Sequence, residues 1–332
     1  MAKRITLKDV AKAAGVSLAS ASYAVNRTGS LGEESRIRIL RVAEDLGYRQ
    51  NMSAKATRTG KTGTIGLVVP DLTNPFFPTL AQSVVQRARH HDYSVFVTDT
   101  GGVDDLEKEV LKVLAERGVD GIVWFPIRDV DTAGASIADI PTIVVDRSVP
   151  GFETIQADYA GGGRAAIAHL IELGHRHIGV ICGPMDIASM RDRCEAAIQT
   201  IRSQAELSFV VENSFSIDLD GQVVDALDAG TATAVFVGAD LIALGVMRHV
   251  QARGQRVPED LSVIGFDDIP WAAMSTPPLT TIEMPVEDMA GEAVDALVRR
   301  IEDQIHLKRR VILETVMIER CSTAPHPQVA IS

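Results

Sequence analysis

The segment GVSLASASYAVN, residues 15–26, has the start of a helix but an unusual composition for one. Its residues 18–24 include small side chains, one leucine and one tyrosine, and no charge. A helix buried on all sides needs apolar residues all round, and Ser20 and Ser22 argue against that arrangement. The segment is therefore either part of a core or a surface that lies against something else, and its neighbours in the sequence decide between the two.

The residues before this segment predict a first short helix and a turn. Thr6, with Asp9 three residues later, has the form of an N-cap that satisfies free amide groups at a helix start. A short apolar stripe follows, and Gly15 ends the helix. The turn Gly15-Val16-Ser17 then places Ser17 as the cap of a second helix. Helix, three-residue turn and helix is the spacing of a helix-turn-helix.

A third helix is expected over residues 33–46, with Gly47 at its end. Its predicted apolar face consists of Ile37, Leu40, Ala43 and Leu46. The second helix can pack against the other two through Ala21, Ala24 and Val25. This leaves a face with no core to join, made of Leu18, Ala19, Ser22 and Tyr23. Such an uncharged face can enter a DNA major groove without burying an unpaired ion, while surrounding lysines and arginines meet the phosphates.

The charge of the chain is distributed unevenly. Residues 1–62 contain twelve lysines and arginines against five acidic residues, a net charge of +7, so the total of −11 leaves −18 for the remaining 270 residues. A basic head on an acidic body indicates a polyanion-binding module attached to a part that binds no polyanion, although a solvated basic face would give the same counts.

The composition is that of an ordinary folded protein. Hydrophobic residues make up 46% and charged residues 23% of the 332 residues, which excludes a disordered chain. No run approaches 18 apolar residues, and the first ten residues lack the apolar region of a signal peptide, so we expect a cytoplasmic protein. The cysteines are odd in number and widely spaced, which predicts reduced thiols and neither a disulfide framework nor a zinc site: Cys182, Cys194 and Cys321.

These motifs also resemble a known family. TLKDVAKAAGVS, followed by a serine-rich helix that ends in Val25-Asn26, resembles the helix-turn-helix of the lac repressor/gal repressor family of bacterial regulators. The resemblance continues through EESRIRILRVAEDLGYRQN and TGTIGLVVPDLTNPFF to RCSTAP, and thus covers essentially the whole chain. It implies that the head contacts DNA through Thr6, Ser17, Leu18, Ala19, Ser22, Tyr23 and Asn26.

A polar linker, residues 49–62, joins the head to the body. It has helix potential over residues 51–58, but so short a helix is unstable alone in water and would fold only against a partner chain and DNA. The resemblance implies such a hinge helix, which pairs across a dimer and pushes a leucine into the minor groove; Thr57 takes that place here. The DNA-binding positions of the hinge are then Asn51, Ala54, Lys55 and Thr57, and a plain flexible linker is the alternative.

From residue 63 onward, apolar strands alternate with segments of helical period. Continuous β-branched runs between helices indicate parallel strands buried on both faces. The series is too long for one sheet of usual size, and a pause near residues 151–158 divides it into two Rossmann-like lobes. The expected strands are 64–70, 93–99, 119–125, 142–146, 177–183, 232–238 and 261–266, and the expected helices 78–91, 105–117, 160–173 and 240–253.

The predicted fold is therefore an all-α helix-turn-helix head followed by an α/β body of two Rossmann-like lobes. By resemblance the lobes are similar to periplasmic sugar-binding proteins, are linked by three crossovers and hold an effector between them. The expected boundaries are 1–48 for the head, 49–62 for the hinge and 63–332 for the effector-binding and dimerisation domain, with a first lobe of 63–157 and 286–318 and a second of 158–285 and 319–332.

Polar residues stand where predicted strands end, the edge at which open α/β sheets bind ligands. Asp146 and Asp267 each follow a strand, and Arg193 lies in the helix after another. Such groups together can bind several hydroxyls or a planar polar ring, although each alone is more often a cap or an ion pair. The resemblance implies an effector site of Phe76, Phe77, Asp146, Arg193, Phe215 and Asp267, with Ile217 competing for the place of Phe215 and Ala239 where asparagine is common.

We therefore expect a dimeric transcription regulator, a repressor by resemblance, that binds operator DNA and responds to a sugar or related metabolite without a cofactor or metal. The chain ends without a heptad tail that would join dimers into tetramers. A solute-binding protein would explain two lobes but not the basic head. An enzyme would need a catalytic constellation, and no GxSxG, HExxH or GxGxxG is present, while His175 and His177 have the positions of caps or surface residues.

Overall fold

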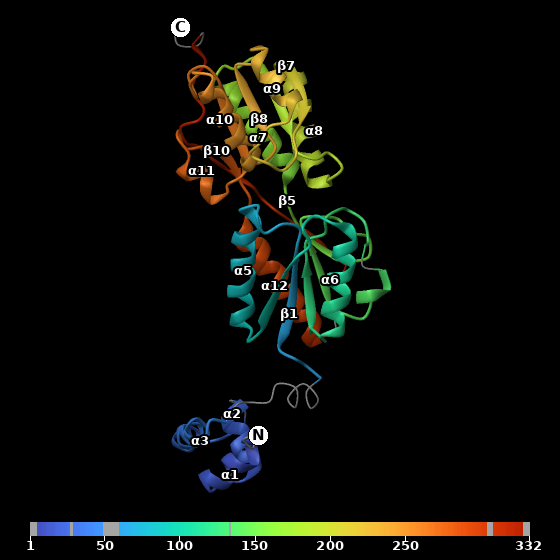
Figure 1. The fold of residues 1–332 in the computed structure, drawn as a ribbon, viewed down its shortest axis with the longest axis vertical. Coiled ribbons are helices and arrows are strands. Elements are labelled where there is room, and N and C mark those ends of the chain that lie inside the picture. The colour runs from blue at the N-terminus through green and yellow to red at the C-terminus, as the bar shows by residue number, and fades with distance from the viewer. Residues whose placement is uncertain (1–4, 27–28, 49–59, 133, 304–307, 328–332) are drawn as a thin grey trace. The chain divides into compact units, whose positions relative to one another are not determined.

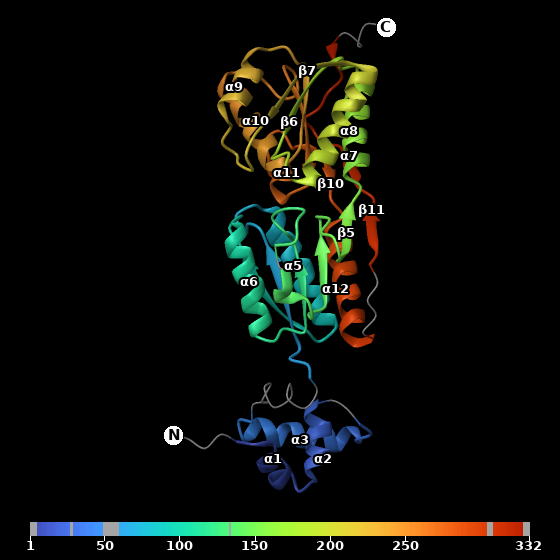
Figure 2. The ribbon, with the colours of Figure 1, turned by 90° about the vertical axis from the view of Figure 1, so that its right-hand side faces the viewer.

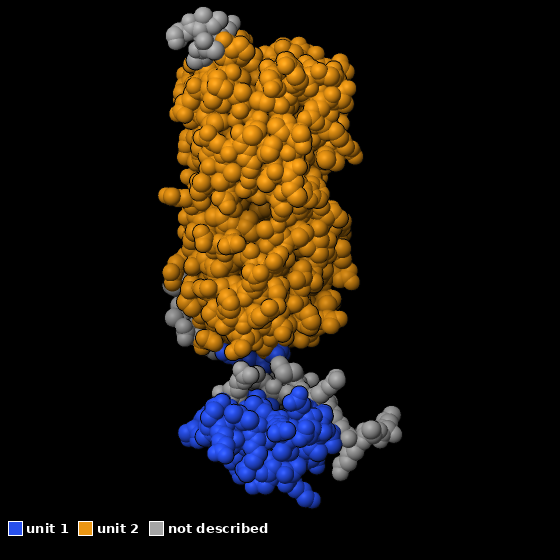
Figure 3. Space-filling view, turned by 90° about the vertical axis from the view of Figure 1, so that its left-hand side faces the viewer, with its two compact units in different colours: residues 1–62 blue, residues 63–332 orange. Residues whose placement is uncertain are grey.

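The computed structural model describes residues 5–26, 29–48, 60–132, 134–303 and 308–327 of the chain. The chain forms two compact units, residues 1–62 and residues 63–332, which Figure 3 colours separately. We call the first unit the head and the second the body. The predicted hinge positions Asn51, Ala54, Lys55 and Thr57 lie outside the described residues.

Three short helices build the head: α1 (Leu7–Ala14), α2 (Leu18–Asn26) and α3 (Glu33–Asp45). The predicted cap of α1 is confirmed, because the Asp9 amide donates to the Thr6 hydroxyl at 3.4 Å and the Thr6 amide donates to the Asp9 carboxylate at 2.8 Å. Gly15 ends α1 with a φ of 65°, a left-handed conformation that glycine adopts without steric cost. The helices enclose a small core of Val10, Ala11, Ala21, Ala24, Ile39 and Ala43.

The predicted apolar face of α3 is confirmed for Ala43 and Leu46 but wrong for Ile37 and Leu40. Ile37 is 59% exposed and Leu40 is 36% exposed, whereas Ile39 and Ala43 pack in the core. Positions three residues apart drift by about 60° per step around a helix, so a run of such positions that begins at Ile37 cannot stay on one narrow face. Ile39 and Ala43 are four residues apart and remain on the side that meets the other two helices.

The first lobe of the body is a six-stranded parallel sheet in the order β11-β5-β4-β3-β1-β2. Helices α5 and α12 pack against each other, and α6 lies on the other side of β1 from α5 (Figure 1). As predicted, the inner strands are buried along nearly their whole length. The elements are β1 (Thr64–Val69), α5 (Phe76–His90), β2 (Ser94–Asp99), α6 (Asp104–Glu116), β3 (Gly121–Trp124), β4 (Thr142–Val145), β5 (Glu153–Ala157), α12 (Val286–Asp303) and β11 (Arg310–Leu313).

The second lobe repeats this plan, with the sheet order β12-β10-β9-β8-β6-β7. All of its strands are parallel to their neighbours except β12, which runs antiparallel to β10. Helices α7 and α8 pack side by side along this lobe (Figure 2). The elements are α7 (Tyr159–Glu172), β6 (His177–Cys182), α8 (Ala188–Gln204), β7 (Glu206–Glu212), α9 (Gly221–Asp228), β8 (Ala234–Val237), α10 (Asp240–Ala252), β9 (Ser262–Asp267), α11 (Pro270–Met274), β10 (Thr280–Glu283) and β12 (Val316–Ile318).

The chain crosses between the lobes three times, after β5, after β10 and after β11. The third crossing corrects the predicted end of the first lobe at residue 318, because β12 pairs with β10 and so belongs to the second lobe. The pause predicted near residues 151–158 contains β5, whose five residues are all buried. The polar residues of β5 are the reason why the sequence did not predict this strand. The Gln156 side chain donates to the Asp146 carbonyl at 3.2 Å and accepts from Arg310 at 2.6 Å.

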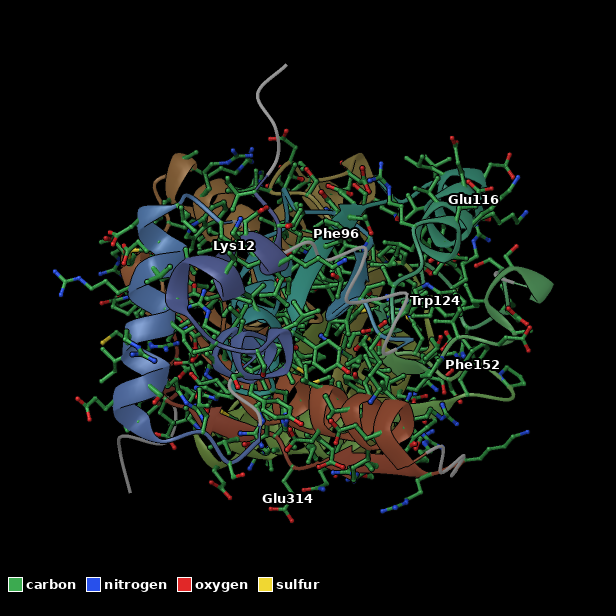
Figure 4. All side chains as sticks on the ribbon, turned by 90° about the horizontal axis from the view of Figure 1, so that it is seen from below. Lys12, Phe96, Glu116, Trp124, Phe152 and Glu314 are labelled. Atoms are coloured by element: carbon green, nitrogen blue, oxygen red, sulfur yellow. The ribbon has the colours of Figure 1, made fainter. Side chains whose placement is uncertain are left out.

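A buried carboxylate ties the first sheet to the loop after β3. Glu107 of α6 accepts bonds from Trp124 Nε1 at 3.0 Å, from the Ile127 amide at 2.9 Å and from the Thr132 hydroxyl. Trp124 packs edge-on against Phe152 with ring centroids 5.7 Å apart (Figure 4). Because Glu107 is fully buried and bonded through both oxygens, it fixes the loop of residues 127–132 at the end of the sheet.

Of the two histidines predicted as caps or surface residues, His177 is exposed but His175 is buried. The His175 ring contacts the Thr233 hydroxyl and the Ala324 carbonyl, both at 3.0 Å, and its burial lowers its pKa to about 4. Cys182 and Cys194 are buried free thiols, and Cys321 is an exposed one. Within the described ranges no group of three or more potential ligands could hold a metal ion, and no helix is long and apolar enough to cross a bilayer.

Candidate functional site

A cavity of about 210 Å³ lies between the two lobes of the body. Its lining includes residues at the carboxyl ends of β1, β4 and β9, the edge at which open α/β sheets bind ligands. Side chains from residue 70 to residue 284 meet in it, so only the folded body assembles this site. All six residues predicted to form an effector site line this cavity: Phe76, Phe77, Asp146, Arg193, Phe215 and Asp267.

Arg193 is the central charged residue in the second lobe's wall. It is only 4% exposed, and its Nη1 donates to Asp267 Oδ1 and to the Gly238 carbonyl, both at 2.8 Å. The guanidinium also lies over two aromatic rings, 3.9 Å from the centroid of Phe266 and 5.1 Å from that of Tyr159. These contacts hold the guanidinium in place at the cavity wall, which is the preorganisation that a polar binding site requires.

Both strand-end aspartates have unusual backbone conformations. Asp146 has a φ of 70° and Asp267 a φ of 113°, and four non-glycine residues in the described part of the chain have a positive φ. Aspartate tolerates the left-handed region better than most residues, and such conformations cluster at ligand sites. Burial raises the pKa of Asp267 above its usual value, and the positive charge of Arg193 opposes that shift.

A second ion pair in the wall was missed at the level of sequence. Arg147 Nη1 pairs with Asp146 and donates to the Ser189 hydroxyl at 2.9 Å. Asp146 also accepts from the Tyr159 hydroxyl and from the Ser189 hydroxyl at 3.3 Å, and burial raises the pKa of Tyr159 to about 12, so that this hydroxyl stays a donor. Because Tyr159 and Ser189 belong to the second lobe, the pair joins the two lobes. A cation directly after a strand-end carboxylate was the signal that could have found it.

Phenylalanines form the apolar part of the cavity wall. Phe76 and Phe77 open α5 and meet edge-on at 5.2 Å between centroids, and Phe77 continues the contact to Phe125 at 5.9 Å. Phe215 reaches the cavity from the second lobe. Its predicted competitor, Ile217, is not among the lining residues.

A further contact crosses between the lobes beside the cavity. The Asp129 carboxylate accepts from the Ser148 amide at 2.9 Å in its own lobe and from the Ala188 amide at 2.8 Å in the other. Ala188 is the first residue of α8, whose own N-cap residue, Ile187, supplies no side-chain bond. The helix that carries Arg193 is thus capped by a negative charge from the opposite lobe, which suits the helix dipole.

The head exposes the face of α2 that was predicted to have no core to join. Leu18 is 45% exposed and Tyr23 is 46% exposed, Ala19 is also exposed, and Ser22 is partly exposed. A Cβ atom on Gly29 would lie 2.8 Å from Cγ of the Tyr23 ring, so only a glycine at this position can pack so closely against the ring. The short uncharged segment is therefore buried on one side, through Ala21 and Ala24, and forms an exposed uncharged surface on the other.

The polar residues at the ends of α2 are partly engaged within the head. The Ser17 hydroxyl accepts from the Ser20 amide at 3.0 Å, which confirms it as the cap of α2. The Asn26 side chain donates to the Ser22 carbonyl at 2.8 Å and to its hydroxyl at 3.0 Å. The Thr6 hydroxyl serves the cap of α1 and remains exposed. Each predicted DNA-contact position of the head thus lies at or near the surface.

Comparison with known proteins explains both units. The description "Bacterial regulatory proteins, lacI family" matches residues 6–51, and "Periplasmic binding protein-like domain" matches residues 167–323. The ribose operon repressor of Halalkalibacterium halodurans is 31% identical over 325 residues, which are 96% of this chain and 97% of that protein. The chain belongs to the lacI family of bacterial regulatory proteins. The lacI-family match covers the head that exposes α2, and the second match covers most of the second lobe.

Two further relatives match nearly the whole chain. The transcriptional repressor PurR of Vibrio atlanticus is 32% identical over 330 residues, or 95% of this chain and 97% of that protein. The crystal structure of the lac repressor dimer bound to operator and the anti-inducer ONPF superposes with a TM-score of 0.84 at 26% identity, covering 97% of this chain and all of that one. The predicted fold, a helix-turn-helix head on a body of two α/β lobes, is confirmed.

One buried carboxylate supports the site in this lacI-family chain without lining the cavity. Asp240 begins α10, directly after Ala239, and is fully buried. Its oxygens accept from the Ile269 amide at 3.0 Å and from the Thr281 hydroxyl at 2.6 Å, which fixes the turn that follows Asp267. Burial, reinforced by the negative charge of Asp267, raises the pKa of Asp240 well above its usual value.

Replacing Asp240 by asparagine is expected to stabilise the body at pH 8 and to leave it nearly unchanged at pH 4. A carboxyl group with a raised pKa in the folded state stabilises fully below its unfolded pKa of about 3.9, and this contribution is lost as pH rises through the folded pKa. The loss for one group is at most about 1.4 kcal/mol per pH unit. The asparagine oxygen can accept from the Ile269 amide, its NH2 group can donate to the Thr281 hydroxyl oxygen, and the side chain does not titrate.

Urea unfolding of both proteins at several pH values between 4 and 8 measures this difference. The gain from Asp240→Asn should grow with pH across that window. A gain that is the same at every pH would show that Asp240 is not the titrating group. Asp105→Asn, on the exposed surface of α6, serves as the control for removal of a carboxylate.

Proposed function

We propose that this chain is a cytoplasmic, sequence-specific DNA-binding repressor whose operator binding is modulated by a small-molecule effector, a sugar or related metabolite, bound between the lobes. The observation that carries the proposal is the inter-lobe cavity, in which Arg193, Asp267, Asp146 and the three phenylalanines meet, in a chain that also exposes an uncharged α2. The relatives support it, because the ribose operon repressor and PurR are both repressors and align with 96% and 95% of this chain.

In the proposed complex, α2 lies in the major groove and its amino-terminal residues contact base edges. Thr6, Ser17, Ser22 and Asn26 offer single hydrogen bonds, and lysines and arginines of the head contact phosphates. The hinge positions Asn51, Ala54, Lys55 and Thr57 would follow the minor groove, with threonine in place of an apolar wedge. Selection of bound sequences from random duplex DNA tests this function; recovery of no preferred sequence would refute it.

The half-site is expected to depend on thymine methyl groups more than on bidentate hydrogen bonds. Leu18 and Ala19 are exposed and apolar, and Tyr23 offers one hydroxyl where an arginine would offer two parallel donors. Replacing thymine by uracil across the selected half-site should therefore weaken binding, by about 0.8 kcal/mol for each methyl group that the complex buries. Unchanged affinity in a titration by fluorescence anisotropy would contradict this reading of α2.

We infer that the effector acts by changing the balance between two arrangements of the lobes. An effector can shift such a balance only if it binds the two arrangements with different affinities. The links from Asp129 to Ala188 and from Arg147 to Ser189 join the lobes beside the cavity, so a ligand there is well placed to bias them. A ligand that stabilises the body but leaves operator affinity unchanged would contradict this coupling.

We also propose that the protein is a homodimer with β2 in the interface. Strand β2 is an edge strand in which Phe96 is 47% exposed and Val97 is 40% exposed. An uncovered apolar edge strand favours pairing with another chain. By resemblance to the lac repressor/gal repressor family, the dimer surface also includes the helix that contains Pro78 and the helix of residues 286–300, and both lie in the same lobe as β2. Two heads on one dimer would then read two half-sites.

Replacing Phe96 by lysine is expected to convert the dimer to a monomer at micromolar concentration, because an unpaired charge would be buried in the interface. Sedimentation velocity measures the change. Val113→Lys, at a 37% exposed apolar position on α6, is the matched control and should leave the dimer intact. A Phe96→Lys protein that remains dimeric would move the interface away from β2.

A further inference from the structure

Every guanidinium in the cavity wall is already paired with a carboxylate. Arg193 pairs with Asp267 at 2.8 Å, and Arg147 pairs with Asp146. Asp71 adds a third carboxylate to the lining. Among the residues that the structure describes, the lining contains no lysine, no histidine and no further arginine. The wall therefore offers no positive charge that lacks a counter-charge.

An anionic ligand would have to compete with these carboxylates. Arg147 is 6% exposed and Arg193 is 4% exposed, and the side chains of Asp146 and Asp267 are 9% and 13% exposed. A phosphate that took over either guanidinium would leave a carboxylate buried without its partner. Separating a buried charge pair in this way typically costs about 30-fold or more in affinity.

A hydroxyl group fits the same wall without separating either pair, because it both donates and accepts. The protein's own Ser189 shows the pattern: its hydroxyl accepts from Arg147 at 2.9 Å and donates to Asp146 at 3.3 Å. A ligand hydroxyl could repeat this bridge at the Arg193–Asp267 pair on the other side of the cavity. Several hydroxyls on one small molecule would therefore match the wall.

The remaining lining and the size of the cavity limit the ligand further. The C–H groups of a ligand ring can pack against apolar side chains of both lobes. These side chains include Phe77, Ile127, Met190, Phe215 and Met284. The volume of about 210 Å³ is below the roughly 300–1,000 Å³ of sites that bind drug-sized ligands. A compound with a single ring fits a cavity of this size.

We propose that the cavity selects an uncharged, single-ring polyhydroxy compound, a monosaccharide or cyclic polyol, against its phosphate and carboxylate derivatives. The selection is set by the two matched ion pairs, with Arg147 and Asp146 as the specificity-determining pair of the first lobe. The inference rests on the proposed function, since it names the class of effector for the same site.

The test uses the full chain and compounds in matched sets. Pentoses, hexoses and cyclic polyols are each compared with their phosphate ester and sugar acid by thermal shift and then by isothermal titration calorimetry. Disaccharides, nucleosides and purines complete the panel. At least one uncharged single-ring compound should stabilise the body, and its phosphate should bind at least about 30-fold more weakly.

The possible outcomes separate this inference from the proposed function. A phosphate or acid that binds as tightly as its parent, or a purine, nucleoside or disaccharide that binds when no single-ring polyol does, overturns the inference and leaves an effector-responsive repressor. If no compound of any class binds, the inference fails together with the effector part of the proposed function. Selection of an operator remains an independent test of the DNA-binding part.

Two variants locate the selectivity in the ion pair of the first lobe. Asp146→Asn leaves Arg147 unmatched and should reduce the preference for the uncharged compound over its phosphate by about tenfold or more. Arg147→Met leaves Asp146 unmatched and should increase that preference. Asp105→Asn, whose side chain is 93% exposed on α6, should leave the preference unchanged.

The variant results decide the assignment even if one protein does not fold. A native circular dichroism spectrum with an unchanged ratio of affinities in either cavity variant would show that this pair does not set the selectivity. Opposite changes in the two variants, with no change in the control, would support it. The ratio is informative because a merely structural role would weaken the binding of both compounds alike.

Discussion

Replacing Arg193 by alanine is expected to abolish stabilisation by the effector and to lower the free energy of unfolding of the body by about 3–5 kcal/mol. Arg193 is 4% exposed, so solvent does not screen its interactions. Its removal leaves Asp267 buried without a counter-charge and the Gly238 carbonyl without its donor. The aromatic rings of Phe266 and Tyr159 also lose the cation that lies over them.

Thermal and urea unfolding of the purified chain measure the loss of stability, and titration with a compound that stabilises the native protein measures the loss of binding. Arg202→Ala, at an exposed position on the same helix, is the control and should change stability by less than about 0.5 kcal/mol. Retention of ligand-induced stabilisation in Arg193→Ala would place the effector outside this cavity. A small loss of stability would show that Asp267 is neutral without Arg193.

Replacing Gly163 by alanine is expected to have the second largest effect. A Cβ atom on Gly163 would lie 2.2 Å from the Arg193 carbonyl oxygen, a backbone atom of α8 that cannot rotate away. Helices α7 and α8 would have to separate, and overpacking of this kind costs about 1–3 kcal/mol or more, well above the roughly 0.5–1 kcal/mol that alanine contributes within a helix. Because α8 also carries Arg193 and Ser189, effector affinity should fall as well.

The matched control for this substitution is Gly221→Ala. Gly221 is the first residue of α9 in the same lobe, and a Cβ atom there meets nothing within 4 Å. This variant should be as stable as the native protein or slightly more so. Equal melting temperatures for the two variants would show that α7 and α8 adjust to the added methyl group.

Much of the fold follows from local sequence patterns, and the exceptions have physical causes. The inner strands are continuous apolar runs, and the structure confirms each predicted strand of the body to within three residues at either end. The strands that were missed are β5, β7, β10, β11 and β12, which are short or contain polar residues. A buried polar side chain such as Gln156 is tolerated only because Arg310, 154 residues away, bonds to it.

The candidate site shows the same division. Asp146, Arg193 and Asp267 could be predicted because polar residues at strand ends meet at one edge of a sheet. Arg147 and Asp129 could not, since their roles depend on residues of the other lobe that are 42 and 59 positions away. Titration of the native protein and of the Arg147→Met variant with effector measures whether the Arg147 link contributes to effector binding.

The sequence by itself determined the head's capped helices and their uncharged outer face, the alternation of strands and helices in the body, and the polar residues at the strand ends. These features depend on hydrogen bonds and periodicities within about four residues along the chain, so they can be predicted from the sequence. Only the tertiary structure decided which face of α3 is buried, that residues 316–318 complete the second sheet, and that every arginine in the cavity is paired. Those outcomes depend on contacts between distant segments, whose geometry is set when the lobes pack and not by the local order of residues.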